Sequence, residues 1–253
     1  MRDNSDRSDS VLDQHGTFRK HAFPVVLSAF VFAVAILCLL EKMHRMRLSV
    51  YSTACVQNSY EIALHLRAYK ERHGHYPPPV VYDENGKPKH SWRVLILQNH
   101  QPFYSAYDFD EPWNGPNNRK LSDQMPRFFK CAMDQSSPPT HTSFLAITGI
   151  GTAFPTDNSS GDENVKDYPG NKIIVAEVSN SGIHWMEPKD LEVETMSFRV
   201  NDESRPSIRS HHEKGAAVIY GDLDHGWLNP VVSPLKVKNM AIITKGIISR
   251  DAP

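Results

Sequence analysis

The sequence predicts an α+β fold in which one long N-terminal helix packs on a small antiparallel β-sheet with long irregular loops. An uncharged apolar run from Ala22 to Leu40 is followed by an amphipathic stretch with no helix breaker before Gly74. Further along the chain, short apolar runs bounded by turn residues are typical of strands. The 18 prolines against 13 glycines indicate a loop-rich fold rather than a repeat.

Composition excludes some classes of partner and site. The 253 residues carry 29 acidic and 28 basic side chains, so no broad basic face is expected and nucleic acid is not an expected partner. The three cysteines are too few for a disulfide scaffold, and their spacing is not that of a zinc site.

The N-terminal region divides into a tail and a membrane segment. Residues 1–21 are polar and mixed in charge, which predicts a flexible tail. Residues 22–41 are predicted to cross a membrane and contact its lipid, since a helix from Phe23 to Leu40 spans about 27 Å. A cleaved signal peptide is the alternative, but no small-x-small cleavage site follows Leu40. Basic residues flank both ends, so charge alone does not orient the segment.

Residues 42–253 are predicted to form one domain that begins with the second half of the helix. Gly74 is placed as a left-handed helix stop, with three prolines shortly beyond. The residues of the predicted buried face recur at steps of three and four: Tyr51, Cys55, Ser59, Ile62, Leu66 and Tyr69.

The rest of the domain is predicted to consist of short elements. Asn85-Gly86 predicts a tight turn, and Ser91 is a candidate N-cap for a short helix, although "WRVLIL" also suits a strand. The predicted strands are Ser143 to Thr148, Lys172 to Val178 and Ala216 to Tyr220.

Several sequence blocks resemble, in order, a planctomycete family of pilin-like proteins of unknown function marked by a C-terminal H-x9-DG motif. The blocks include "CVQNSYEIALHLRAY", "HGHYPP", "MPRFFKCAMD", "TSFLAITGIGTAF" and "IHWMEPKDL". His212 and Asp222 stand at the motif spacing, but Leu223 replaces the motif glycine. The aligned positions of the pilin cleavage glycine and fifth-residue glutamate are Ala22 and Leu27, so the resemblance does not carry over filament processing.

This resemblance implies a pilin-like fold, a cytoplasmic N-terminus and a C-terminal domain on the exterior, periplasmic side. It implies other pilin-like or secretion-system proteins as partners. On that exterior side Cys55 and Cys131 are a candidate disulfide. The alternative is two separate buried thiols.

The stretch "HHEKGAAVIYGDLDHGWL", residues 211–228, is the main candidate for chemistry. It predicts two strands joined by a tight turn, in which Asp222 and Asp224 cap their own turn by side-chain hydrogen bonds. Because Leu223 takes a positive φ only at a cost, we expect the turn to shift onto residues 224–226. His212, Asp222 and Asp224 are weak candidates for a metal site, and none is expected. The oxygen-rich segment 157–164 lacks EF-hand spacing, which favours a solvated loop over a calcium site.

The predicted function is a membrane-anchored, pseudopilin-like structural or interaction protein. No catalytic motif is recognised, so neither enzymatic activity nor a cofactor is expected. An exterior carbohydrate- or peptide-binding module is the alternative, with Trp92, Trp113, Trp185 and Tyr104 as stacking surfaces.

Overall fold

The computed structural model describes residues 9–156 and 169–243, with side chains from residue 27 onward. It divides into two units, residues 1–50 and 51–253, which are described separately. The predicted α+β class is confirmed, with one long N-terminal helix and small, mainly antiparallel sheets. The oxygen-rich segment 157–164 lies outside the described residues.

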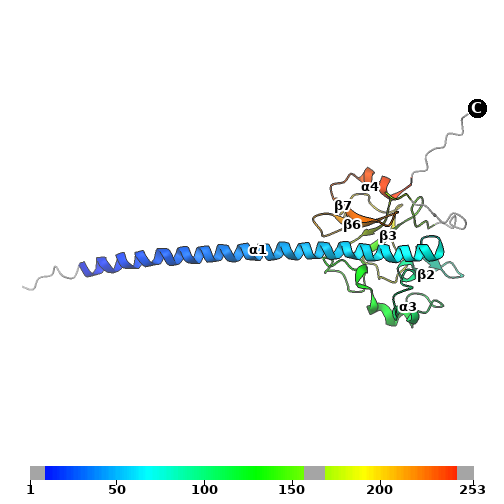
Figure 1. Ribbon diagram of the computed structural model, residues 1–253, viewed down its shortest axis with the longest axis horizontal. Helices are drawn as coiled ribbons and strands as arrows, with labels where there is room; N and C mark the ends of the chain where they lie inside the picture. The colour runs from blue at the N-terminus through cyan, green and yellow to red at the C-terminus, as the bar shows by residue number, and fades with distance from the viewer. Residues whose placement is uncertain (1–8, 157–168, 244–253) are drawn as a thin grey trace, which may run out of the picture. The chain divides into compact units, whose positions relative to one another are not determined.

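Helix α1 spans Asp9–His73, 65 residues (Figure 1). It begins within the predicted flexible tail, so residues 9–21 are helical, whereas residues 1–8 lie outside the described part of the chain. Once an apolar helix has nucleated, each further residue adds one backbone hydrogen bond without a new nucleation cost. Extension of the helix into a polar segment is therefore favourable, and composition alone did not predict it.

The part of α1 in the second unit buries the predicted stripe. Five of its six members are buried, namely Cys55, Ser59, Ile62, Leu66 and Tyr69, whereas the first, Tyr51, is only half-buried. The residues between them are largely exposed or half-buried. The helix ends at the predicted position. Gly74 has φ +81° and its amide donates to the Lys70 carbonyl at 2.8 Å, as expected of a left-handed helix stop.

A five-stranded sheet forms the centre of the second unit, in the order β5-β3-β4-β6-β7. β3 runs parallel to β5, and every other neighbouring pair is antiparallel. The strands are β3 (Phe144–Thr148), β4 (Ile173–Glu177), β5 (Leu191–Glu192), β6 (Ala216–Tyr220) and β7 (His225–Leu228). The three strands predicted from sequence correspond to β3, β4 and β6 within a residue at each end.

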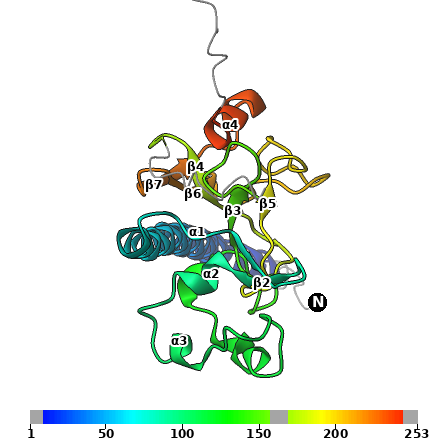
Figure 2. The same cartoon turned by 90° about the vertical axis from the view of Figure 1, so that its right-hand side faces the viewer.

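The two faces of this sheet carry separate cores. On β6, Ala217 and Ile219 join a cluster with the buried face of α1, whereas Ala216 and Val218 join a cluster with helix α4, Pro234–Ala241. This alternation follows from the two-residue period of a strand. Figure 2 accordingly shows α4 and the α1 segment on opposite sides of the sheet.

The remaining elements lie across α1 from the sheet (Figure 2). Strands β1 (Val80–Tyr82) and β2 (Pro88–Ser91) form a hairpin in which Gly86 has φ +74°, which confirms the predicted turn. Ser91 caps α2, so "WRVLIL" begins as a helix and not as a strand. The short helices are α2 (Trp92–Leu95), α3 (Phe103–Ala106), and the 3-10 helices η1 (Asn118–Gln124) and η2 (Arg127–Phe129).

Candidate functional site

Four chemically active side chains meet in the interior of the second unit. Cys55 comes from α1, Cys131 from the turn after η2, Glu177 from the end of β4, and His212 from the loop before β6. One potential ligand atom of each lies within 4.8 Å of those of the other three, and no side chain of the four is more than 4% exposed. We call this group the Cys-Glu-His cluster.

The contacts inside the cluster are specific. The Cys55 thiol donates to Glu177 Oε2 at 3.6 Å, and Cys131 Sγ lies 3.2 Å from His212 Nε2. The other ring nitrogen of His212, Nδ1, lies 3.2 Å from Ser52 Oγ on α1. Glu177 Oε2 also accepts from the Ala217 amide at 3.0 Å. The imidazole and the carboxylate of the cluster are therefore each held in one orientation by a second contact.

Burial and hydrogen bonding shift the pKa values of three members of the cluster. Desolvation lowers the pKa of His212 to about 4, with smaller contributions from His211 and Lys214, so the ring is neutral at pH 7. Burial raises the pKa of Glu177. The hydrogen bond with Cys131 raises the pKa of the Cys55 thiol, and desolvation and the Glu177 carboxyl raise it further. The environment thus favours neutral groups at each of these positions.

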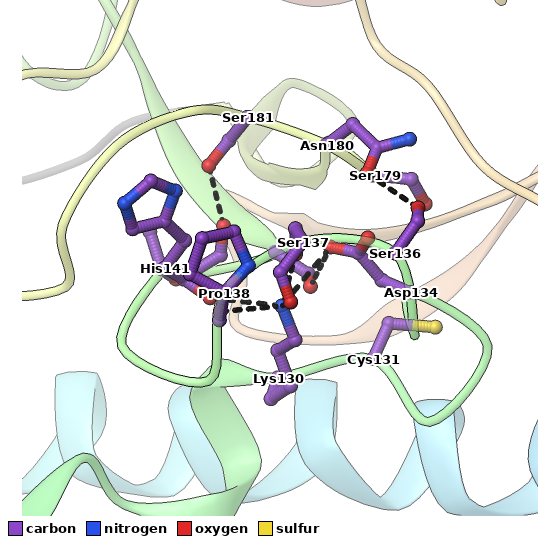
Figure 3. A network of polar contacts seen from close by, with 12 residues as sticks. Lys130, Cys131, Asp134, Ser136, Ser137, Pro138, His141, Ser179, Asn180 and Ser181 are labelled. Atoms are coloured by element: carbon purple, nitrogen blue, oxygen red, sulfur yellow. Dashed lines mark hydrogen bonds and ion pairs between the residues drawn. The ribbon is translucent and has the colours of Figure 1, made fainter. Parts of the chain in front are cut away.

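The turn that carries Cys131 is fixed by its neighbour Lys130. The Lys130 ammonium lies 3.5 Å from Asp134 Oδ2, contacts the Ser137 hydroxyl, and donates to the carbonyls of Pro138 and His141, each at 3.2 Å. Figure 3 shows this network and the Cys131 sulfur directed away from it. The ammonium closes the loop, and the thiol remains available to the cluster.

Asn58 ties the same turn to α1. Its side-chain amide donates to the Lys130 carbonyl at 2.7 Å. Asn58 stands three residues after Cys55, so both side chains lie on neighbouring positions of one helix face. This contact holds the turn that carries Cys131 against the helix that carries Cys55.

The structure brings some of the predicted site residues together and leaves others apart. Cys55 and Cys131 are adjacent, both as free thiols, and the disulfide between them stays a prediction. His212 belongs to the cluster, whereas Asp222 and Asp224 lie in the turn between β6 and β7 and do not join it. The structure therefore groups the histidine with other side chains than the two aspartates.

Glu177 was not found by sequence reasoning. The signal was present, because a single carboxylate stands inside the apolar run "KIIVAEV". An acidic residue in a strand that is buried on both faces is rare unless it is paired or ligates a metal.

The turn between β6 and β7 confirms one prediction and corrects another. Asp222 Oδ1 accepts from the Asp224 amide at 3.0 Å, and Asp224 Oδ1 accepts from the His225 amide at 2.8 Å, as expected for turn capping. The turn does not shift, however: Leu223 takes the left-handed conformation, with φ +67°. Its side chain is 8% exposed and packs in the core shared with α1, and this burial offsets the backbone strain.

At position 223, a glycine variant should therefore be more stable than an alanine variant, which is the reverse of the usual order inside a helix. We expect Leu223→Gly to have a free energy of unfolding about 1 kcal/mol higher than that of Leu223→Ala, because only glycine is unstrained at positive φ. At Leu66, inside α1, the order should be the ordinary one, with alanine favoured by about 1 kcal/mol. Urea unfolding of the four variants measures both differences. Equal stability of Leu223→Ala and Leu223→Gly would contradict the strain.

The prediction that four aromatic side chains form an exposed stacking surface is wrong, because these side chains pack in or against the core. Trp92 and Trp185 are fully buried in the core, where Trp185 Nε1 donates to the Ser122 carbonyl at 2.9 Å. Trp113 and Tyr104 are partly buried and pack against the same core. Large aromatic side chains in a loop-rich domain supply the apolar area that a small sheet does not.

One helix of the described residues, spanning 27–73, is long and apolar enough to cross a membrane by length and composition. None of its most apolar 18-residue window is buried. Apolar side chains are exposed all around this part of α1, including Phe30, Val31, Phe32 and Leu37. A helix that is apolar on every face and unburied is unlike the core helix of a soluble protein.

Comparison with known proteins places the second unit in a family. Residues 52–188, more than half of the chain, match the model of a family described as "Protein of unknown function (DUF1559)". The chain belongs to this family. Three members of the Cys-Glu-His cluster, Cys55, Cys131 and Glu177, lie within the matched segment, and His212 lies beyond it. No curated protein and no solved structure matches the chain.

Proposed function

We propose that the protein is a membrane-anchored, pseudopilin-like structural or interaction protein whose second unit stands on the exterior side of the membrane. The observation that carries this proposal is the contrast along α1. Its apolar part, around residues 27–43, is exposed, whereas its part from Cys55 onward buries one face against the core of the second unit. A single helix that is apolar on all faces and then amphipathic suits a lipid environment followed by a folded domain.

The chain is proposed to keep its N-terminal segment. Ala22 and Leu27 stand where a pilin carries its cleavage glycine and its fifth-residue glutamate. A permanent anchor would present the second unit to other pilin-like or secretion-system proteins without polymerisation. This role is non-catalytic, and its partners contact the exterior unit.

Membrane retention is the test of the anchor. We expect the full chain to sediment with membranes, to resist alkaline carbonate and to be released by detergent. The double variant Val31→Arg with Ala35→Arg should lose this retention, because an arginine at the centre of a membrane helix costs about 2.5–3.5 kcal/mol on insertion scales. Val231→Arg is the control, and it should keep membrane retention. Val231 is an exposed valine like Val31 (87% against 59%), but it lies in the second unit and outside the apolar helix.

The same membranes test the rest of the proposal. The intact mass should include the residues before Ala22, and protease added outside spheroplasts should digest the second unit. A wild-type chain that is recovered in the soluble fraction would overturn the anchor. A mature chain starting at Phe23, particularly an N-methylated one, would replace the permanent anchor with pilin-type processing.

A further inference from the structure

We propose that Cys55, Cys131, Glu177 and His212 bind a Zn²⁺ ion as a closed, four-ligand structural site. The ligand chemistry is that of zinc, which takes thiolate, imidazole and carboxylate ligands in tetrahedral structural centres. The four residues come from four separate segments, so an ion at this point would join α1, the turn after η2, β4 and the loop before β6.

The spacing of the ligand atoms fits such a centre. Zinc–ligand bonds of about 2.0–2.3 Å in a tetrahedron place neighbouring ligand atoms about 3.3–3.8 Å apart. The Cys55 Sγ to Glu177 Oε2 distance is 3.6 Å and the Cys131 Sγ to His212 Nε2 distance is 3.2 Å. No pair of the ligand atoms is more than 4.8 Å apart. Small side-chain rotations therefore suffice to close the site.

The buried carboxylate is a second, independent argument. Glu177 is fully buried, yet no ion pair to a basic side chain is found for it in the described ranges. An ionised carboxylate away from water is costly unless it is paired with a cation or coordinates a metal. A divalent cation between Glu177 and the two sulfurs would supply that partner, and its binding would displace to solvent the protons that the carboxyl and thiol groups carry in its absence.

The outer contacts are those that a metal site requires. A ligating histidine usually donates its other ring N–H to an oxygen, which fixes the tautomer. His212 places Nδ1 3.2 Å from Ser52 Oγ, and in the tautomer that donates this Nδ1–H to the hydroxyl the Nε2 lone pair is directed toward the cluster. Ala217 donates its amide to Glu177 Oε2 at 3.0 Å and fixes the carboxylate.

A disulfide between Cys55 and Cys131 is the competing use of the same two sulfurs, and the experiment separates the two. The full chain is purified in detergent from its native membranes, and its zinc content and thiol state are measured. We expect one Zn²⁺ per chain and both thiols reduced. Zinc-edge X-ray absorption should show two sulfur neighbours at about 2.3 Å and two nitrogen or oxygen neighbours at about 2.0–2.2 Å.

Variants of the reduced chain, titrated with Co²⁺ and then Zn²⁺, locate the site. Wild type should develop thiolate-to-cobalt charge-transfer and tetrahedral d–d absorption, which Zn²⁺ then removes. Ser52→Ala should weaken Zn²⁺ affinity about 10–100-fold, as expected for loss of an outer-shell partner, and Cys131→Ser should weaken it more. Cys38→Ser removes the third cysteine of the chain, which is exposed and outside the cluster, and should change nothing.

Three results would overturn the proposal. The first is a Cys55–Cys131 disulfide in the protein from native membranes, seen as a loss of two hydrogens by mass. The second is a reduced, folded wild-type chain that binds neither ion. The third is a zinc-edge X-ray absorption spectrum that shows only oxygen and nitrogen neighbours around the zinc, which would indicate a surface-bound ion. Because measurements on the wild type decide each case, failure of a variant to fold leaves the test intact.

Discussion

Replacing Arg93 with methionine should lower the free energy of unfolding by about 3–5 kcal/mol, because it leaves a buried carboxylate without its cation. The Arg93 guanidinium lies 2.6 Å from Asp190 Oδ1, and the two side chains are 0% and 2% exposed. Arg93 also donates to the backbone carbonyls of Trp185, Glu187 and Lys189 at 2.8–3.0 Å. One side chain thus holds the whole segment 185–190 against α2.

Asp190, the aspartate of this pair, also accepts hydrogen bonds from two other residues. Asp190 Oδ1 accepts from Trp92 Nε1 at 3.0 Å and from the Ala146 amide at 2.8 Å, so it links α2 to β3. Burial raises the pKa of Asp190, and Arg93 and the hydrogen bonds oppose that rise. Without Arg93 the folded-state pKa rises further above the unfolded value. A proton is then bound more tightly in the folded state, and the loss of stability in the variant should shrink as the pH falls.

Arg205→Met is the matched control for Arg93→Met. Arg205 is exposed and donates to the Thr195 carbonyl at 2.7 Å, so its loss should cost no more than about 1 kcal/mol. Denaturant unfolding at neutral pH and at acidic pH measures both variants. If Arg93→Met cost no more than Arg205→Met, the buried pair would not have the structural role assigned to it. The double variant with Asp190→Asn should recover part of the loss, since no buried charge is then left unpaired.

The sequence predicted the elements whose cause is local. The stripe through Ile62 and Leu66, the stop at Gly74 and the cap at Ser91 each depend on residues within a few positions, and the structure confirms all three. The strands followed from apolar runs and turn residues in the same way.

What the sequence did not predict depends on distant partners. The Arg93–Asp190 pair joins residues 97 positions apart, and the Cys131–His212 contact joins residues 81 apart. The sequence did not predict that the side chain of Glu177 is fully buried, because this burial depends on the packing of the sheet against α1. Leu223 was expected to avoid positive φ, and local strain alone supports that expectation. The core contact that offsets the strain is not visible in the sequence.

Among the glycines of the described ranges, Gly215 is where an added methyl group should destabilise the fold most. Its φ is +107°, and a Cβ there would fall well inside contact distance of the Leu228 carbonyl oxygen, on the neighbouring strand β7. Backbone strain of about 1–3 kcal/mol and overpacking of about 1–3 kcal/mol add, so Gly215→Ala should lose about 2–6 kcal/mol. Gly182 is the control: its φ is +71° but nothing lies within 4 Å of its would-be Cβ. Gly182→Ala should lose only the strain, about 1–2 kcal/mol.

Gly215→Ala should also displace a member of the Cys-Glu-His cluster. The Gly215 amide donates to the His212 carbonyl at 3.0 Å, which closes the turn that places the imidazole next to Cys131. If the backbone at residue 215 moves away from Leu228, His212 moves with it. Gly215→Ala should therefore lose more stability than Gly182→Ala, by the overpacking that the two variants do not share, and the Co²⁺ titration should weaken only in the first. Equal losses in the two variants would mean that the β6–β7 pair can open at this end, and that the turn does not depend on a glycine to hold the histidine.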